Sequence, residues 1–90
     1  DFNAIAETSD TWLAATGATL RDAWLTADNR HGPARTSNDF LPPELANEGR
    51  IDWILTGGTL KVHSIRTVID HKNGQYPSDH YPVVAKIKLF

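Results

Sequence analysis

Near its C-terminus the chain reads Pro77-Ser78-Asp79-His80-Tyr81-Pro82-Val83-Val84. In this stretch a carboxylate and an imidazole follow a turn proline and lead directly into a strand. Apolar side chains at positions 83, 85, 87 and 89 alternate with Val84, Lys86 and Lys88, which is the period-two pattern of a half-buried strand. Because a strand is a rigid platform, we expect Asp79 and His80 to keep one orientation at its mouth, as an acid/base or metal site requires.

The composition describes a single small globular unit. The chain has 90 residues, of which 40% are hydrophobic and 22% are charged, and this length is too short for two domains. It contains no cysteine, which excludes disulfides and thiolate zinc sites. It also contains no methionine and begins at Asp1, so we expect a processed product or a piece of a longer protein.

Charge and hydropathy narrow the range of partners. The formal net charge of -2 offers no basic surface for the backbone of duplex DNA. No apolar run approaches the length of a membrane span or of a signal sequence. We therefore expect a soluble protein. Its compartment, cytoplasmic or secreted, stays open because a signal could lie in a missing N-terminal segment.

Two short helical segments are expected in the first part of the chain. Ser9 is a good N-cap for a helix over residues 10–16, and Gly17 suits a left-handed end of that helix. Leu13 would lie on its buried stripe. Residues 20–25 have apolar side chains four positions apart, which predicts a helical turn or a short helix.

Strands dominate the rest of the prediction. Residues 50–55, 60–69 and 83–89 are rich in β-branched or alternating apolar side chains, and Asn73-Gly74 is typical of a tight turn between the last two. Residues 26–49 are mostly loop, because Asp, Asn, Gly and Pro are frequent there. We add short strands near Asp1 and Ala34.

Asp52 is unusual because it is a carboxylate inside an apolar strand. Burial of a carboxylate is costly unless a cation or a donor satisfies it, and Arg50 or Lys61 could do so in a purely structural role. The adjacent Asp79 and His80 could likewise be only a turn-stabilising pair. The polar residues that a sheet could bring to one edge are Asp1, Asn3, Asp52, Asp79 and His80.

Three motifs occur in a fixed order along the chain: Asp1-Phe2-Asn3-Ala4, then Arg50-Ile51-Asp52-Trp53-Ile54, then Pro77-Ser78-Asp79-His80-Tyr81-Pro82-Val83. This order resembles the C-terminal half of the endonuclease/exonuclease/phosphatase superfamily, which includes the DNase I-like nucleases. The resemblance implies an α/β (α+β) fold, namely the C-terminal half of a two-sheet sandwich with mostly antiparallel strands and one or two short helices. Residues 1–90 would then be a single incomplete domain.

The resemblance also implies catalytic roles. Asp1 would orient or deprotonate the attacking water, and Asn3 would donate to the scissile phosphate. His80 would contact a nonbridging phosphate oxygen, and Asp52 would hold the His80 imidazole in the correct tautomer. Asp79 would lie near a divalent metal, Mg²⁺ or Mn²⁺, directly or through water. The loop residue Asn38 is a further candidate for substrate contact.

The first half of such a domain supplies a metal-binding glutamate and other groups that this chain lacks. We therefore expect a metal-dependent phosphoesterase, whether nuclease, phosphodiesterase or phosphatase, of which the isolated chain is catalytically inactive. The substrate could be a nucleic acid, a phospholipid or a small phosphate ester, and the mild acidity favours a small or single-stranded one. The apolar face that meets the missing N-terminal half would make the chain self-associate. The alternative is a non-catalytic β-rich interaction module derived from the same fold.

Overall fold

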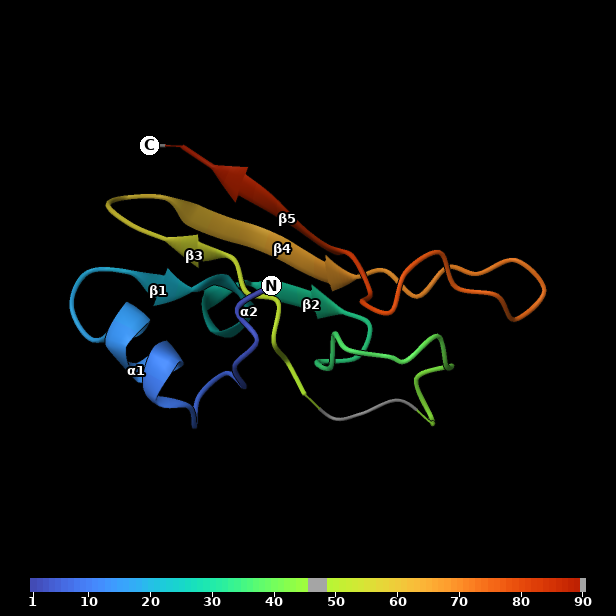
Figure 1. Ribbon diagram of the computed structural model, residues 1–90. Helices are drawn as coiled ribbons and strands as arrows, with labels where there is room; N and C mark the ends of the chain where they lie inside the picture. The colour runs from blue at the N-terminus through green and yellow to red at the C-terminus, as the bar shows by residue number, and fades with distance from the viewer. Residues whose placement is uncertain (46–48, 90) are drawn as a thin grey trace.

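The computed structural model describes residues 1–45 and 49–89 (Figure 1). The described elements, in chain order, are α1 (Asp10–Thr16), β1 (Arg21–Asp22), α2 (Ala23–Thr26), β2 (Asn29–His31), β3 (Leu55–Thr56), β4 (Lys61–Thr67) and β5 (Val83–Lys88). They form a two-stranded sheet, β1-β3, and a three-stranded sheet in the order β2-β4-β5. This mixture of two sheets and short helices confirms the predicted fold class.

The three-stranded sheet is built around β4. β5 pairs with it antiparallel from Lys61↔Lys88 to Thr67↔Val83, with a bulge between Val62 and Ser64. β2 lies on the other side of β4 and runs parallel to it, as Figure 1 shows. The alternation expected in β5 is present at its start, because Val83 is half-buried against the core whereas Val84 is exposed.

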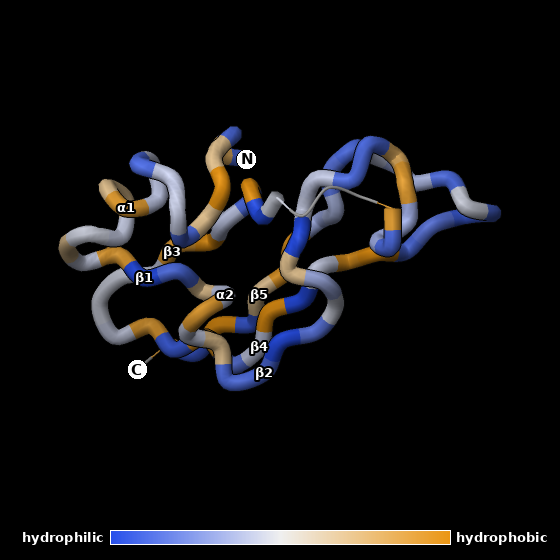
Figure 2. The backbone as a smooth tube through the Cα atoms, turned by 90° about the horizontal axis from the view of Figure 1, so that it is seen from below, coloured by the Kyte–Doolittle hydropathy of each residue, from blue (hydrophilic) through white to orange (hydrophobic). Residues whose placement is uncertain are grey.

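The hydrophobic core lies between α2 and β4 and is small. Ala23 and Ala27, at the two ends of α2, pack with Val62 and Ile65 of β4. The two alanines allow the helix to approach the strand closely, and partly buried side chains of Trp24, Ile54, Val83 and Ala85 surround this centre. In Figure 2 apolar and polar stretches alternate along β4 and β5, in keeping with one covered face and one open face.

An extended arm, residues 68–76, follows β4 and contains the predicted turn at its tip. Lys72 and Gln75 exchange both backbone hydrogen bonds, at 3.0 and 2.9 Å. Asn73 and Gly74 between them have positive φ angles of 53° and 77°, as a two-residue hairpin turn requires. The arm projects away from the sheets in Figure 1, and it then returns to deliver residues 77–82 to the start of β5.

The bounds and the N-cap of the first helix, α1, are confirmed, but its predicted buried stripe and left-handed end are not. Ser9 caps it by accepting from the N–H of Trp12. The expected buried stripe is wrong, because α1 has no buried residue and Leu13 is 51% exposed. The left-handed end is also wrong: Gly17 has a φ of -74°. Glycine is needed there for a different reason, since a Cβ atom would lie 2.9 Å from the Leu13 carbonyl oxygen.

Several predicted strands are shorter than expected or replaced. Of residues 50–55 only the last belongs to a strand, β3, because the N–H groups of Ile51 and Asp52 bond to the Thr36 hydroxyl instead of to a neighbouring strand. Residues 20–25 divide between β1 and α2. The strand near Ala34 reduces to one bridge, Ser37↔His80.

The strand expected near Asp1 is absent from the described residues, because the backbone bends at Asn3 and Ala4. Asn3 and Glu7 have positive φ angles there, at 49° and 72°, which are incompatible with extended pairing. No helix among residues 1–45 and 49–89 is long and apolar enough to cross a membrane.

Candidate active site

A buried ion pair holds the segment that carries Asp52. Arg50 lies two residues before Asp52, and its Nη1 and Nη2 atoms are 2.9 and 2.8 Å from the two carboxylate oxygens of Asp22. Asp22 also accepts from the Trp12 indole N–H at 2.7 Å and, as the N-cap of α2, from the N–H of Trp24 at 3.0 Å. Both charged side chains are buried, so this fork anchors the Arg50 backbone to α1 and α2.

The N-terminal segment is laid against the same stretch. The N–H of Phe2 donates to the Ile51 carbonyl at 2.8 Å, and the Phe2 ring stacks on Trp53 with centroids 4.1 Å apart and planes inclined by 12°. Asp1 is thereby brought beside Asp52. The N–H of Asn3 donates to Asp1 Oδ1 at 2.8 Å, which orients the Asp1 carboxylate.

His80 arrives from the other direction, on the segment before β5. The N–H of Asn38 donates to the Asp79 carbonyl at 2.8 Å, and the N–H of Tyr81 donates to the Thr36 carbonyl at 2.7 Å. The two bonds flank His80 and form a short antiparallel ladder. Tyr81 itself is buried, and its hydroxyl donates to the Leu41 carbonyl at 2.6 Å.

The side chains of these three segments converge on the His80 imidazole. Nδ1 of His80 lies 2.8 Å from Asp52 Oδ2. Nε2, on the opposite side of the ring, lies 3.7 Å from Asp1 Oδ2 and 3.9 Å from Asp79 Oδ1. Because an ionised carboxylate can only accept, the bond to Asp52 places a proton on Nδ1. Nε2 is therefore the ring atom that faces the open side of the cluster.

Asp52 is ionised in this setting. Partial burial raises the pKa of Asp52, but hydrogen bonds from His80 and Thr36 and the positive charge of His80 outweigh this effect, so that the net pKa is below the ordinary value of 3.8. Because its pKa is lowered, Asp52 can accept the hydrogen bond from His80 Nδ1–H at neutral pH.

The cluster also offers donors for a cation. One ligand atom each from Asp1, Asp52 and His80 can be chosen so that all lie within 4.8 Å of one another. The Asp79 carboxylate is close by and 59% exposed. Carboxylate oxygens are the ligands that a hard divalent cation such as Mg²⁺ prefers. Asp79 is not a member of this group, so its part in holding a metal stays a prediction.

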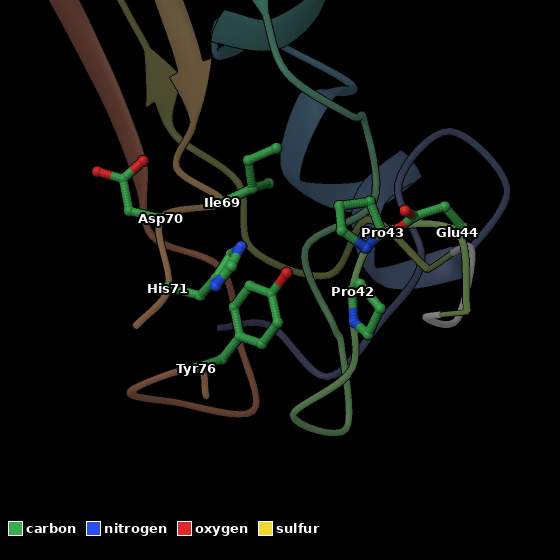
Figure 3. Close-up of a pocket in the computed structure, with 7 residues that line it drawn as sticks. All are labelled: Pro42, Pro43, Glu44, Ile69, Asp70, His71 and Tyr76. Carbon is green, nitrogen blue, oxygen red and sulfur yellow. The ribbon is translucent and has the colours of Figure 1, made fainter. Parts of the chain in front are cut away.

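Two cavities lie near these segments, and their linings differ. The smaller, of about 320 Å³, is lined by Asp52, Ser78, His80 and their neighbours. The larger, of about 820 Å³, lies between the Pro42–Glu44 loop and the arm, with Asp70, His71 and Tyr76 on its other side (Figure 3). None of the residues that converge on His80 lines this larger cavity. The cavity beside His80 is the better place for the chemistry.

The structure thus gathers Asp1, Asp52, Asp79 and His80 at one point. Asn3 is exposed beside them. Asn38 is fully buried, with its Nδ2 atom unpartnered among the described residues, and the contact it makes toward the site is the backbone bond to Asp79. Substrate contact by Asn38 stays a prediction.

The suggested structural partners of Asp52 are wrong. Arg50 pairs with Asp22, and Lys61 lies 3.3 Å from Asp28. Sequence reasoning missed the part that Asp22 and Thr36 play. A buried carboxylate that caps a helix could have been suspected from Asp22, which precedes an apolar helical turn, whereas a single threonine in a loop offers no comparable pattern.

No protein-family model and no curated protein matches the chain, but solved structures do. The chain is similar to a mannosyl-6-phosphatase of Bacteroides thetaiotaomicron VPI-5482, with a TM-score of 0.81 and 25% identity over 94% of this chain and 34% of that one. An endonuclease/exonuclease/phosphatase family protein of Bacteroides thetaiotaomicron gives a TM-score of 0.83 at 25% identity, over 92% of this chain and 32% of that one.

A third solved structure, the endonuclease/exonuclease/phosphatase from Bacteroides vulgatus, has a TM-score of 0.76 and 26% identity over 96% of this chain and 33% of that one. The chain therefore spans about a third of the length of each of these proteins. Nearly all of it matches them in one fold, and the sequence motifs that suggested the family lie together in space. These findings confirm the assignment of the chain to the endonuclease/exonuclease/phosphatase superfamily.

Proposed function

We propose that this chain supplies part of the active site of a divalent-metal-dependent phosphoric ester hydrolase. The observation that carries the proposal is the 2.8 Å contact between His80 Nδ1 and Asp52, with Asp1 and Asp79 on the Nε2 side of the ring. Two carboxylates and an imidazole on one open face meet the needs of water attack at phosphorus. Such attack requires a positioned water and donors to the phosphoryl oxygens.

Each residue has a distinct role in the proposal. Asp52 holds the His80 ring and stabilises its protonated form, so that Nε2–H can donate to a nonbridging phosphate oxygen. Asp1, whose carboxylate is turned toward Nε2, accepts a proton from the attacking water or orients it. The Asn3 amide donates to the same phosphate. In this proposal the base, Asp1, and the phosphate donor, His80 Nε2, lie 3.7 Å apart.

The metal that the family resemblance implies, Mg²⁺ or Mn²⁺, would be held by Asp79, directly or through water, beside the group of Asp1, Asp52 and His80. When bound, it would neutralise negative charge on the phosphoryl and leaving oxygens. Asp79 is mostly exposed, as a residue that reaches a hydrated cation through water would be.

We propose a small phosphate ester as the substrate, rather than duplex DNA. The formal net charge of -2 disfavours binding along a polyanion. One of the similar proteins is a mannosyl-6-phosphatase, which supports a phosphomonoester of a small molecule. We further propose that the 90 residues alone are inactive, because the remaining two-thirds of the similar proteins has no counterpart in this chain. The alternative is a non-catalytic interaction module, which would have the same fold but would not bind a metal.

The test is a Mg²⁺ or Mn²⁺ titration of the ¹⁵N-labelled chain, followed by NMR. We expect metal-specific shifts at the amides of Phe2, which adjoins Asp1, and of Asp79 and His80, and we expect Asp79→Asn and His80→Ala to weaken them. Asp70→Asn, which removes an exposed carboxylate of the arm, serves as the matched control and should bind as the parent chain does. Absence of any shift at millimolar metal would favour the interaction module. Hydrolysis of bis(p-nitrophenyl) phosphate by the chain, at the rate of a full-length relative, would contradict the proposed inactivity.

A further inference from the structure

Thr36 is hydrogen-bonded to both backbone segments that carry the His80–Asp52 pair. It is buried, with 1% of its surface exposed. Its hydroxyl oxygen accepts two backbone hydrogen bonds, from the N–H of Ile51 at 3.0 Å and from the N–H of Asp52 at 3.1 Å. Its carbonyl oxygen accepts from the N–H of Tyr81 at 2.7 Å, the residue that follows His80.

From these contacts we infer that Thr36 is a positioning residue, which sets the distance between Asp52 and His80 through one hydroxyl and one carbonyl. The inference rests on the proposed function, in which that pair orients the imidazole toward phosphate. Thr36 would not touch substrate. Its part would be to hold both backbones that present the pair.

The local backbone explains why a hydroxyl is needed. Residues 51–54 belong to no strand, so the N–H groups of Ile51 and Asp52 have no strand partner of their own. A hydroxyl has two acceptor lone pairs and can satisfy both. Without it, two backbone donors in a half-buried segment would lose their partner, and such groups are seldom left unpaired. The segment would then have to turn, and the Asp52 carboxylate would turn with it.

The carbonyl contact completes the restraint. The N–H of Tyr81 is fixed to Thr36, and Tyr81 is buried with a second anchor through its hydroxyl. The His80 backbone therefore cannot shift relative to Thr36 without breaking these bonds. The backbones of Asp52 and of Tyr81, next to His80, are thus both hydrogen-bonded to Thr36. Movement elsewhere in the loops should therefore leave the 2.8 Å contact between His80 and Asp52 unchanged.

The chain contains a matched control for this threonine. Thr67 in β4 is also buried, with 2% of its surface exposed, but its hydroxyl has no hydrogen-bond partner among the described residues. Thr→Val keeps the shape at both positions and removes one hydroxyl. The change should be harmless or stabilising at Thr67, whereas at Thr36 it should release Ile51 and Asp52.

The experiment is NMR of the His80 ring in the ¹⁵N-labelled chain, with His80→Gln used to assign the signal. We expect a low-field Nδ1–H resonance that exchanges slowly with water. Thr36→Val should speed its exchange by at least about tenfold, because the variant loses two hydrogen bonds and each contributes up to about that factor. Thr36→Ser should restore slow exchange, and Thr67→Val should leave it unchanged. Unchanged exchange in a folded Thr36→Val chain, or an equal effect of Thr67→Val, would overturn the inference.

A second measurement needs no variant and therefore decides the matter even if Thr36→Val does not fold. Amide hydrogen exchange in the parent chain should show Ile51 and Asp52 protected, although neither lies in a strand. If their amides exchange as fast as those of Asp70 and His71 in the arm, the positioning role is refuted. Neither measurement requires metal or substrate, so failure of the proposed hydrolase function would leave these results standing, and the reverse also holds.

Discussion

The buried Asp22–Arg50 pair leads to the sharpest prediction about stability. Three hydrogen bonds reach the Asp22 carboxylate, from Arg50 Nη1, the Trp12 indole N–H and the Trp24 backbone N–H, at 2.7 to 3.0 Å. Arg50 Nη2 adds an ion-pair contact at 2.8 Å. Asp22→Asn keeps the shape of the side chain. It replaces one acceptor oxygen by an N–H₂ group, which would face donors, and it leaves the buried Arg50 guanidinium with only the exposed Glu7 carboxylate, at 3.5 Å, as a counter-charge.

The loss of unfolding free energy expected for Asp22→Asn follows from the burial of the ion pair. The side chains of Asp22 and Arg50 are only 1% and 7% exposed, and breaking a buried pair by removing one partner costs about 3–5 kcal/mol. The control is Asp28→Asn, which removes the Lys61–Asp28 pair, whose side chains are 53% and 47% exposed. An exposed pair contributes about 0–1 kcal/mol. The two isosteric changes should therefore differ by about 2–5 kcal/mol.

The assay is urea unfolding followed by far-UV circular dichroism. With a slope of about 1 kcal/mol/M, the Asp22→Asn midpoint should fall by about 3 M or more, and the Asp28→Asn midpoint by less than about 1 M. A domain this small has little stability to lose, so an unfolded Asp22→Asn chain beside a folded Asp28→Asn chain is the same result in its extreme form. Equal midpoints for the two variants would refute the reasoning that the buried pair anchors the Asp52 segment.

Three further predictions concern acid stability, the arm and association. Because its pKa is lowered from 3.8 in the folded chain, Asp52 contributes stability at higher pH that is lost as the pH falls below about 4 through the folded pKa. The melting temperature of Asp52→Asn should therefore drop less between about pH 6 and pH 3 than that of the parent, and parallel profiles would contradict this. Gly74→Ala, at a φ of 77° in open space, should cost about 1–2 kcal/mol in thermal unfolding, and a neutral result would exclude strain at this turn. Exposed Val84, Ile87 and Leu89 on and after the edge strand β5 should make the chain associate, so light scattering should show a mass that rises with concentration; a monomer at high concentration would disprove this.

Local sequence was sufficient wherever the determinants of structure are neighbours along the chain. Ser9 capped α1 as predicted, because capping involves residues three apart. Asn73-Gly74 formed its turn, because few other residues adopt two successive positive φ angles. The strand that contains β4 was predicted from its β-branched residues, and the strand that contains β5 from alternation. The motif residues Asp1, Asp52 and His80 were also identified before their convergence could be seen.

The tertiary structure alone decided what those residues touch. Asp52 was expected in a continuous strand, but its backbone bonds instead to the hydroxyl of Thr36, sixteen positions earlier. The sequence allowed Arg50 to pair with the nearby Asp52. In the structure it pairs with Asp22, which lies between α1 and α2. Hydrogen-bond partners chosen across long chain separations leave no periodic pattern in the sequence. For that reason the identity of the site could be inferred from the residues, whereas the contacts that hold it in place became visible only in the folded chain.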